Sequence, residues 1–300
     1  MSTGFFCSRL AIIVPTFHPP LALRERLRLL APMVERILVV EDGSAPSTAE
    51  VLGPSTPHNL DLIVLNQNRG IAVAINCGLS RLESTGVVDA VLTLDHDSEI
   101  HPWQLEALYV AYLQAKLSNP AIGCIGPGRM SGVAYERYPR GDLAVTAEIM
   151  QSGSIFSMSA LKSVGPFLEA LFIDCVDTEM CLRLRRAGFV VYVVPSIDLT
   201  HTLGSGRSLS FLGRKVFVTD HSTTRRYLIT RNRVGLILAY WQYEPRWALR
   251  TIRRLIVNTT LGVTVELDRK PKIAAVLKGL FDSRNVWRSI VRRMNGGQNW

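Results

Sequence analysis

Two aspartates stand two residues apart, directly after an apolar segment in the first third of the chain. They are Asp95 and Asp97, and they follow residues 90–94. Carboxylates are the hard oxygen ligands that Mg²⁺ and Mn²⁺ prefer, and a cation that bridges to a diphosphate needs only one or two of them. The pair therefore predicts a divalent metal site. Because aspartate also favours turns between strands and helices, an ordinary turn is the alternative interpretation.

A second acidic turn occupies residues 41–44. Its Asp42 could accept a hydrogen bond from a nucleobase N–H in a half-buried cleft, or form a turn with its own backbone. The loop from Asn68 to Gly70, followed by Asn76, is typical of a backbone that approaches a ligand closely at the start of a helix. These residues are candidates for a nucleotide-binding surface.

A third group of acidic residues begins a predicted helix. Asp177 and Glu179 lie in its first turn, where acidic side chains also stabilise a helix without any catalytic role. A carboxylate held in a substrate cleft is the simplest general base for a hydroxyl nucleophile. His201 follows a strand-like segment and could ligate the same metal, although a lone histidine is more often structural.

Alternating apolar segments and helical patterns must position these residues. Strands followed by helices call for right-handed crossovers and a mainly parallel sheet, whose ligands sit beyond the carboxyl ends of the strands. The turns at Asp42 and at Asp95 are expected at that edge. Over the first hundred residues we predict strands at 10–15, 37–40, 61–65 and 90–94 and helices at 21–31 and 70–82.

The pattern changes in the rest of the chain, and we expect two domains, residues 1–210 and 211–300, with the junction near 198–211. The second domain is expected to be mainly helical. Further strands are predicted at 122–125, 143–150, 154–157 and 189–194, and helices at 177–187, 220–242, 246–263 and 272–293.

Charge is distributed unevenly along the chain. Residues 225–300 carry 16 Lys and Arg against 4 Asp and Glu, whereas residues 1–224 carry 18 against 21. A basic C-terminal third indicates a polyanionic partner. Four of the five tryptophans also lie there, and Trp with Arg on an amphipathic helix suits an anionic membrane surface. A packed helix pair with a solvated basic face is the alternative, and the absence of a recognition module disfavours nucleic acid.

Other features narrow the class of protein. No run of 18 apolar residues predicts a membrane-spanning helix, and the five cysteines form no C-x-x-C pair or zinc spacing. Their odd number and the lack of a secretory signal favour a cytoplasmic location. Neither a dinucleotide-binding fingerprint nor a P-loop is present.

Taken in order, these residues resemble family 2 glycosyltransferases of the GT-A type over roughly residues 10–240. Two segments resemble bacterial dTDP-rhamnosyltransferases more closely. Residues 94–98, Leu-Asp-His-Asp-Ser, correspond to their L-D-Q-D-S, and residues 172–183 correspond to their F-I-D-x-V-D-x-E-W-C-x-R. His96 and Met180 replace the usual Gln and Trp, which puts the identity of the sugar in question more than the reaction class.

The resemblance implies a role for each position. Asp177 would be the catalytic base, with Glu179 supporting a bound sugar, and Arg231, with Arg225 or Arg226, would neutralise the leaving diphosphate. Asp95, Asp97 and His201 would hold a divalent metal, Mg²⁺ or Mn²⁺. The donor would contact a set of residues that comprises Pro15, Thr16, Glu41, Asp42, Asn68, Gly70, Asn76, Asp95 and Arg231.

The implied fold is α/β, a Rossmann-like GT-A domain with a mainly parallel sheet and a C-terminal helical appendage. The implied activity is inverting, metal-dependent transfer of L-rhamnose from dTDP-L-rhamnose to a polyprenyl-diphosphate-linked acceptor or a growing surface polysaccharide. Such an acceptor implies a protein peripheral on the inner face of the plasma membrane. A family 2 transferase that uses a UDP-sugar is one alternative, and a non-catalytic subunit that binds nucleotide sugars is another.

Overall fold

The computed structural model describes residues 6–134, 142–201, 206–211, 214–219, 221–265 and 269–296. Its contacts divide the chain into two units. The first holds the described residues up to Phe172 and from Val176 to His201. The second holds the loop Ile173–Cys175 and the described residues from Gly206 onward. Each unit is described by itself.

The first half of the sheet is parallel, as the sequence predicts. Its order is β3-β2-β1-β4, and every neighbouring pair runs in the same direction. Three of its strands are buried on both faces, which is typical of parallel sheets covered by helices, whereas the edge strand β3 is half-buried. The strands are β1 (Cys7–Thr16), β2 (Val34–Asp42), β3 (Leu60–Leu65) and β4 (Ala90–Thr93).

The second half of the sheet is mixed, so the expectation of a mainly parallel sheet holds only for the first half. β9 (Ser154–Ser157) lies antiparallel between β4 and β6 (Ile122–Met130). β10 (Val190–His201) runs parallel to β6, and β5 (Ser98–Glu99) pairs antiparallel with its last residues. Because β9 enters in the opposite direction, the segment that precedes it is brought next to the carboxyl end of β4.

Two strand predictions need correction. Residues 143–150 were expected to form one strand, but only β8 (Ala144–Val145) pairs, because Thr146 turns its hydroxyl to the carbonyl of Glu148. The strand expected at 189–194 continues to His201. It passes Pro195 through a register shift between Val194 and Asp198, since proline offers no N–H to the ladder. A further short strand, β7 (Val133–Ala134), pairs with β6.

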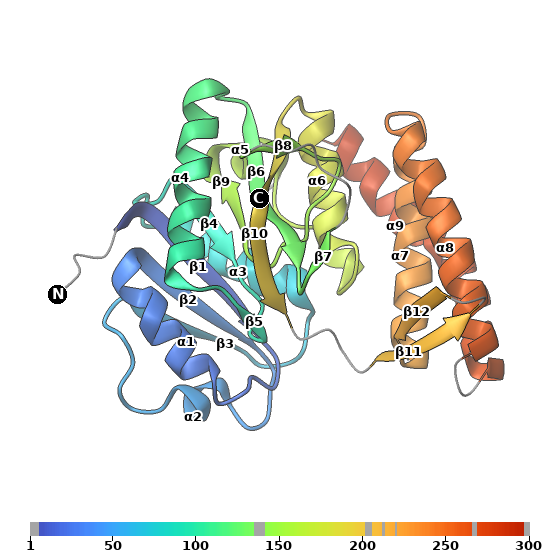
Figure 1. Ribbon diagram of the computed structural model, residues 1–300, viewed down its shortest axis with the longest axis horizontal. Coiled ribbons are helices and arrows are strands. Elements are labelled where there is room, and N and C mark those ends of the chain that lie inside the picture. Colours follow the sequence, from blue (N-terminus) through green and yellow to red (C-terminus); the bar gives the residue numbers. More distant parts are fainter. Residues whose placement is uncertain are drawn as a thin grey trace. The chain divides into compact units, whose positions relative to one another are not determined.

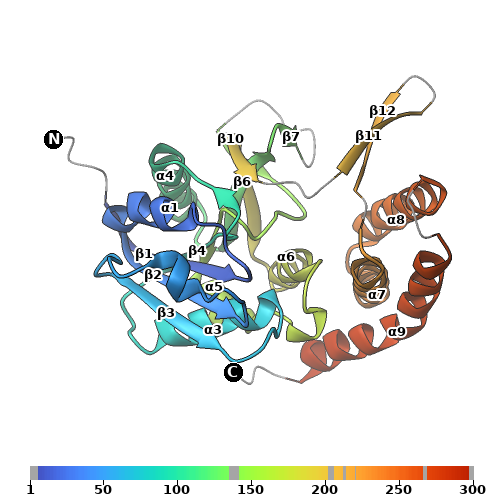
Figure 2. The same ribbon diagram turned by 90° about the horizontal axis from the view of Figure 1, so that it is seen from below.

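Helices cover both faces of this sheet (Figures 1 and 2). α1 (Leu23–Leu30) and α4 (Pro102–Ser118) lie on one face, and α3 (Ile71–Glu83), α5 (Met158–Val164) and α6 (Val176–Arg186) lie on the other. Three short helices complete the unit: α2 (Thr48–Leu52), η1 (Ala31–Met33) and η2 (Glu169–Leu171). The helices predicted at 21–31, 70–82 and 177–187 are confirmed.

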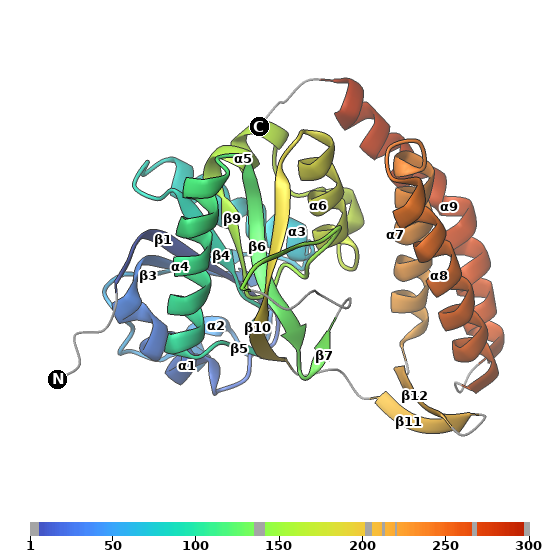
Figure 3. The ribbon, with the colours of Figure 1, turned by 45° about the horizontal axis from the view of Figure 1, so that its top comes forward.

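The second unit begins with a hairpin that the sequence did not predict, β11 (Gly206–Phe211) and β12 (Arg214–Thr219). The expected domain boundary at residue 211 falls at the end of β11. Three helices follow near the predicted positions, α7 (Thr223–Tyr240), α8 (Pro245–Val265) and α9 (Arg269–Asn295) (Figure 3).

Glycines let two of these helices approach closely. A Cβ on Gly235 of α7 would lie 2.6 Å from Val286, and one on Gly279 of α9 would lie 2.8 Å from the carbonyl oxygen of Tyr227. α7 and α9 therefore pack backbone to backbone over a long contact. Among the described helices, none combines the length and apolar character needed to cross a bilayer.

Candidate active site

The acidic turns meet at one edge of the parallel half of the sheet. Thr16 at the end of β1 pairs with Glu41 of β2, and the N–H of Leu94, just past β4, donates to the carbonyl of Ile13 at 3.0 Å. Because these strands run in the same direction, the turns after β2 and β4 both emerge at this edge (Figure 1). Asp42, Asp95 and Asp97 are therefore brought to the same edge, as predicted.

Asp42 holds the neighbouring loop through its carboxylate. Its Oδ1 accepts from the N–H of Arg69 at 2.7 Å, and its Oδ2 accepts from the N–H of Gly70 at 2.8 Å. The side chain is buried, so each of these charge-assisted bonds acts in a low-dielectric environment. The Oδ1 of Asn68 accepts a further hydrogen bond from the same Gly70 N–H at 3.2 Å. The predicted donor-binding loop is thus fixed by the predicted base-binding aspartate.

Glu41 and Thr16 form the buried wall beneath this loop. The carboxylate of Glu41 accepts from the backbone N–H of Thr48 at the start of α2. The hydroxyl of Thr16 lies 2.9 Å from that of Thr48, and all three side chains are buried. Pro15 is buried in the same strand end. These bonds tie the ends of β1 and β2 to the start of α2.

Gly70 and Asn76 connect α3 to the segment that precedes α6. A Cβ on Gly70, whose φ is +93°, would lie 2.5 Å from the carbonyl oxygen of Phe172, so only glycine fits. The amide of Asn76 bonds the backbone of Phe167 in both directions, at 2.8 and 3.0 Å, and also reaches Glu169 at 3.1 Å. Asn76, predicted to contact the donor, is therefore committed to holding this segment.

Asp95 is fixed by two residues that the sequence analysis missed. Gln151 donates from its Nε2 to Asp95 Oδ1, and the N–H of Asp95 donates to Ser152 Oγ at 3.0 Å. The carbonyl oxygen of the Gln151 side chain is buried and has no hydrogen-bond partner among the described residues. Only the pairing of β9 with β4 brings these residues together, since Thr93 is opposite Ser154.

The electrostatics of this turn fit a divalent cation. The pKa of Asp95 is raised to about 7, chiefly by burial and in smaller part by the nearby Asp97, while the bond from Gln151 opposes the rise. Two carboxylates held together in a poorly solvated turn repel each other, and a bound cation would relieve that repulsion. Among the described side chains, no three His, Cys, Asp or Glu converge on a complete metal-ligand set.

The backbone of the third predicted metal ligand, His201, is paired with a residue next to this turn. His201 ends β10 and is paired with Ser98, the neighbour of Asp97. Its side chain falls outside the part of the chain that the structure describes. Burial lowers the pKa of His96, which stands between the two aspartates.

Of the two carboxylates in the first turn of α6, Glu179 is held in an ion pair with Arg183. It is fully buried and accepts two hydrogen bonds from Arg183, at 2.8 and 3.1 Å. Arg183 also donates to the carbonyl oxygens of three successive residues, 164–166. Glu179 therefore anchors α6 to the end of α5. Its spacing of four residues from Arg183 is the signal from which this pairing could have been predicted.

Asp177 is less deeply buried than Glu179. Its Oδ1 accepts from the N–H of Thr178 at 2.7 Å. One turn along α6, the thiol of Cys181 lies 3.9 Å from the carbonyl oxygen of Ile149, in the segment that leads to Gln151. α6 therefore contacts the segment that leads to Gln151.

The loop before α6 is conformationally strained. Phe172, Asp174 and Cys175 have φ values of +64°, +59° and +66°, which non-glycine residues rarely adopt. Such strain persists only where the surroundings impose it, and it is concentrated at functional sites. Asp177 follows this loop directly.

The predicted diphosphate-binding arginines lie on α7, in the second unit. Arg225 forms an ion pair with Asp174 at 3.2 Å, and Asn232 donates to the carbonyl oxygens of Ile173 and Asp174 at 2.8 and 2.9 Å. Arg231 bonds Asn232 at 2.9 Å and lies over the ring of Tyr227, while Arg226 is buried. Within this unit, α7 therefore holds the strained loop.

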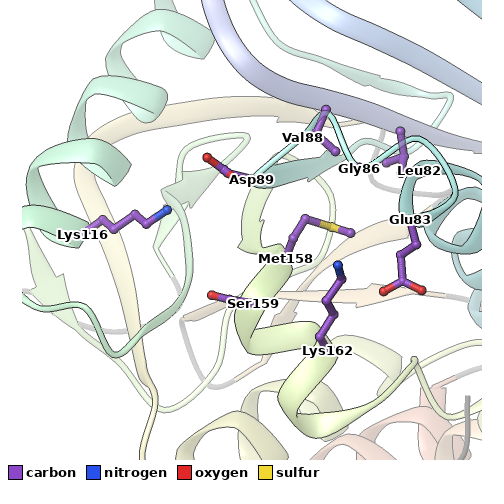
Figure 4. Close-up of a pocket in the computed structure, with 9 residues that line it drawn as sticks. All are labelled: Leu82, Glu83, Gly86, Val88, Asp89, Lys116, Met158, Ser159 and Lys162. Atoms are coloured by element: carbon purple, nitrogen blue, oxygen red, sulfur yellow. The ribbon is translucent and has the colours of Figure 1, made fainter.

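A pocket at the other edge of the sheet lies away from these residues. It is lined by Lys116, Lys162 and Asp89, which precedes β4, whereas Asp95 follows that strand (Figure 4). Asp89 is bonded to Arg9 at 2.6 Å, which lowers its pKa. Asp89 therefore belongs to a surface ion pair and not to the aspartate turns.

Comparison with known proteins decides what kind of site this is. The profile of the family described as Glycosyl transferase family 2 matches residues 11–151, which include both aspartate turns. A dTDP-rhamnosyl transferase RfbF of Shigella flexneri is 28% identical over 240 residues, which cover 73% of this chain and 78% of the relative. Residues 11–151 are therefore a glycosyl transferase family 2 domain.

A second relative supports the same placement over more of the chain. The N-acetylglucosaminyl-diphospho-decaprenol L-rhamnosyltransferase of Mycobacterium tuberculosis is 24% identical over 313 residues, covering 89% of this chain and 97% of the relative. This family 2 glycosyltransferase is thus close to rhamnosyltransferases, as the motifs at 94–98 and 172–183 predict.

Solved structures confirm the predicted GT-A fold. GalNAc-T7, solved with UDP, GalNAc and Mn²⁺, superposes with a TM-score of 0.57 at 11% identity. The match covers 79% of this chain and about half, 48%, of GalNAc-T7. Residues 1–349 of S. aureus TarS superpose with a TM-score of 0.55 at 14% identity, covering 97% of this chain and 93% of that one.

Proposed function

We propose that this family 2 glycosyltransferase moves L-rhamnose from dTDP-L-rhamnose to a lipid-linked or growing surface polysaccharide acceptor, with inversion at the anomeric carbon. The observation that carries the proposal is the gathering of Asp42, Asp95 and Asp97 at one sheet edge. Two relatives that are named for rhamnosyl transfer support the choice of sugar.

Asp95 and Asp97 would hold a divalent cation, with His201 as a third ligand. A cation bound there would neutralise charge that develops on the leaving diphosphate. The repulsion between the two neighbouring carboxylates supports this assignment, and GalNAc-T7, which shares the fold, was solved with Mn²⁺. Asp42 and its loop would bind the nucleoside part of the donor.

Asp177 would be the general base. It would remove the proton from the acceptor hydroxyl as that oxygen attacks the anomeric carbon, in a single displacement. One base without a covalent nucleophile implies inversion, since a retaining mechanism needs a second carboxylate in reach of the sugar. The pairing of Glu179 with Arg183 leaves Asp177 as the candidate base in this turn. The assignment of Arg231 to the diphosphate stays a prediction from the sequence.

The lipid-linked acceptor places the reaction at a membrane. The second unit supports this part of the proposal, because α8 exposes Leu249 and Ile256 beside Arg246 and Arg253. Apolar side chains flanked by arginines suit an interface with anionic lipid. We therefore propose a peripheral protein on the inner face of the plasma membrane.

Calorimetric titration of the purified protein with dTDP and with UDP, each in Mn²⁺ and in EDTA, tests the donor. We expect metal-dependent binding that favours dTDP. A preference for UDP would keep the transferase but replace rhamnose as the sugar, and binding unaffected by EDTA would remove the metal. Failure to bind either nucleotide would overturn the proposed function.

A further inference from the structure

An apolar pocket lies in the second unit, at the ends of α7 and α9. Its volume is 440 Å³, within the range of about 300–1,000 Å³ that is typical of small-molecule sites. It is lined by Ile237, Leu238, Ala239, Trp241, Gln242, Tyr243, Trp287, Val291, Met294 and Asn295. No acidic side chain belongs to this lining, and all of the residues come from a single unit.

The lining exposes large apolar side chains to solvent. Leu238 is 50% exposed, Trp241 44%, Tyr243 51% and Trp287 38%. The two tryptophans, the tyrosine and the leucine leave much of their apolar surface in contact with water. A ligand bound in the pocket would cover that surface. The chemistry of the lining therefore selects an apolar ligand.

Cations flank the pocket on α9. Arg284 and Arg288 are exposed and lie three residues before Trp287 and Val291 respectively, so helical spacing places each arginine beside a lining residue. Asp282, the only acidic residue of α9, is bonded to the hydroxyl of Tyr227 at 2.8 Å. An apolar pocket next to two uncompensated arginines complements a ligand that has a hydrocarbon chain and an anionic head.

We propose that this pocket binds the hydrocarbon chain of an isoprenoid diphosphate, the lipid carrier of the acceptor, and that Arg284 and Arg288 contact its diphosphate. The inference rests on the proposed function, in which the acceptor is lipid-linked, and one relative is named for a decaprenol-linked substrate. A flat bilayer surface would be met by a convex apolar face, whereas a hollow lined by rings encloses a single chain. The remainder of a long chain would stay in the membrane.

The test uses the full chain and geranylgeranyl diphosphate as the probe, with inorganic diphosphate as the ligand without a chain. Trp241 and Trp287 line the pocket, so tryptophan fluorescence reports occupancy and calorimetry gives the affinity. We expect the isoprenoid to bind much more tightly than inorganic diphosphate. Equal affinities for the two ligands would overturn the proposal, because the chain would then contribute nothing.

Substitutions in the pocket test whether geranylgeranyl diphosphate binds there. Trp287→Ala and Leu238→Gln should each weaken geranylgeranyl diphosphate binding by about tenfold, and both positions are exposed enough for the fold to tolerate the change. Phe281→Ala is the matched control, since Phe281 lies on α9 outside the pocket and is 75% exposed. Equal losses in Phe281→Ala would overturn the pocket in favour of diffuse adsorption. Unchanged affinity in both pocket variants would also overturn it.

Two further measurements distinguish the proposed ligand from other possible occupants of the pocket. Arg284→Gln combined with Arg288→Gln should weaken binding of the diphosphate probe and leave binding of geranylgeraniol unchanged; a loss for both ligands would contradict the head-group role. Sedimentation should show the same molecular mass for wild type and Trp287→Ala. A dimer that Trp287→Ala dissociates would assign the pocket to a second copy of the chain. These pocket experiments contain no nucleotide-sugar donor. They therefore test the pocket whether or not the dTDP titration supports the proposed donor.

Discussion

The two units use polar residues in opposite ways. In the first, the polar side chains that matter are buried and bonded to the unit itself: Asp42 to two loop amides, Asn76 to Phe167, and Glu179 to Arg183. In the second, arginines and large apolar side chains are exposed together on α8 and α9. The first unit therefore bonds these polar groups to its own fold, whereas the second leaves arginines and apolar side chains exposed to solvent.

The charge of the chain follows the same division. Residues 225–300 carry 16 basic against 4 acidic residues, and residues 1–224 carry 18 against 21. The net charge of the chain therefore changes from slightly negative to strongly positive along its length. A strongly basic unit attracts anionic ligands from solution or from a membrane.

The largest expected effect is a loss of turnover on replacing Asp177, which distinguishes a catalytic carboxylate from one that only supports the fold of the first unit. Asp177→Asn should reduce turnover by about 10²–10⁴-fold, the usual contribution of a general base, and leave dTDP affinity near that of wild type. Asp89→Asn is the matched control and should leave turnover unchanged, since Asp89 belongs to a surface ion pair with Arg9 away from the site. Turnover measured with saturating donor is the readout. Retained activity in Asp177→Asn would return this residue to a helix-capping role.

A supporting residue should behave differently. Glu179→Ala leaves Arg183 buried without its carboxylate and should lower the free energy of unfolding by about 3–5 kcal/mol. Urea denaturation measures this loss. The exposed pair of Arg9 with Asp89 provides the control, and Arg9→Ala should change stability far less because solvent screens that pair. A stable Glu179→Ala protein that has lost turnover would instead place Glu179 in the reaction.

The smallest effect tests the second unit. Arg253→Gln should weaken binding to anionic vesicles by about fivefold, since each basic residue near such a surface contributes about 1 kcal/mol. Co-sedimentation with vesicles at low and high salt measures this change. Arg36→Gln, in the first unit, is the control and should have no effect. Equal weakening by both substitutions would mean that charge acts alike in the two units.

Much of this arrangement could be predicted from local patterns. Apolar segments that end in Asp42 and Asp95 predict strands whose turns share an edge, because parallel strands present their carboxyl ends together. The helices of the second unit were also predictable from periodicity. The hairpin of residues 206–219 was not, since its pairing depends on contacts between segments and not on the pattern of either one.

The partners of the site residues were beyond prediction. Gln151 contacts Asp95 across 56 positions of sequence only because β9 enters the sheet antiparallel beside β4. Asn76 lies on the same helix as the predicted donor-binding loop but faces Phe167, which no spacing along the chain specifies.

The sequence by itself therefore determined the chemistry available: carboxylates after buried strands, an acidic helix start and a basic, tryptophan-rich C-terminal third. Only the tertiary structure decided which of these groups are bonded to distant parts of the fold. The physical reason is that a carboxylate's role depends on its burial and on the donors around it. Both are set by strand order and helix packing, which join residues far apart in the chain.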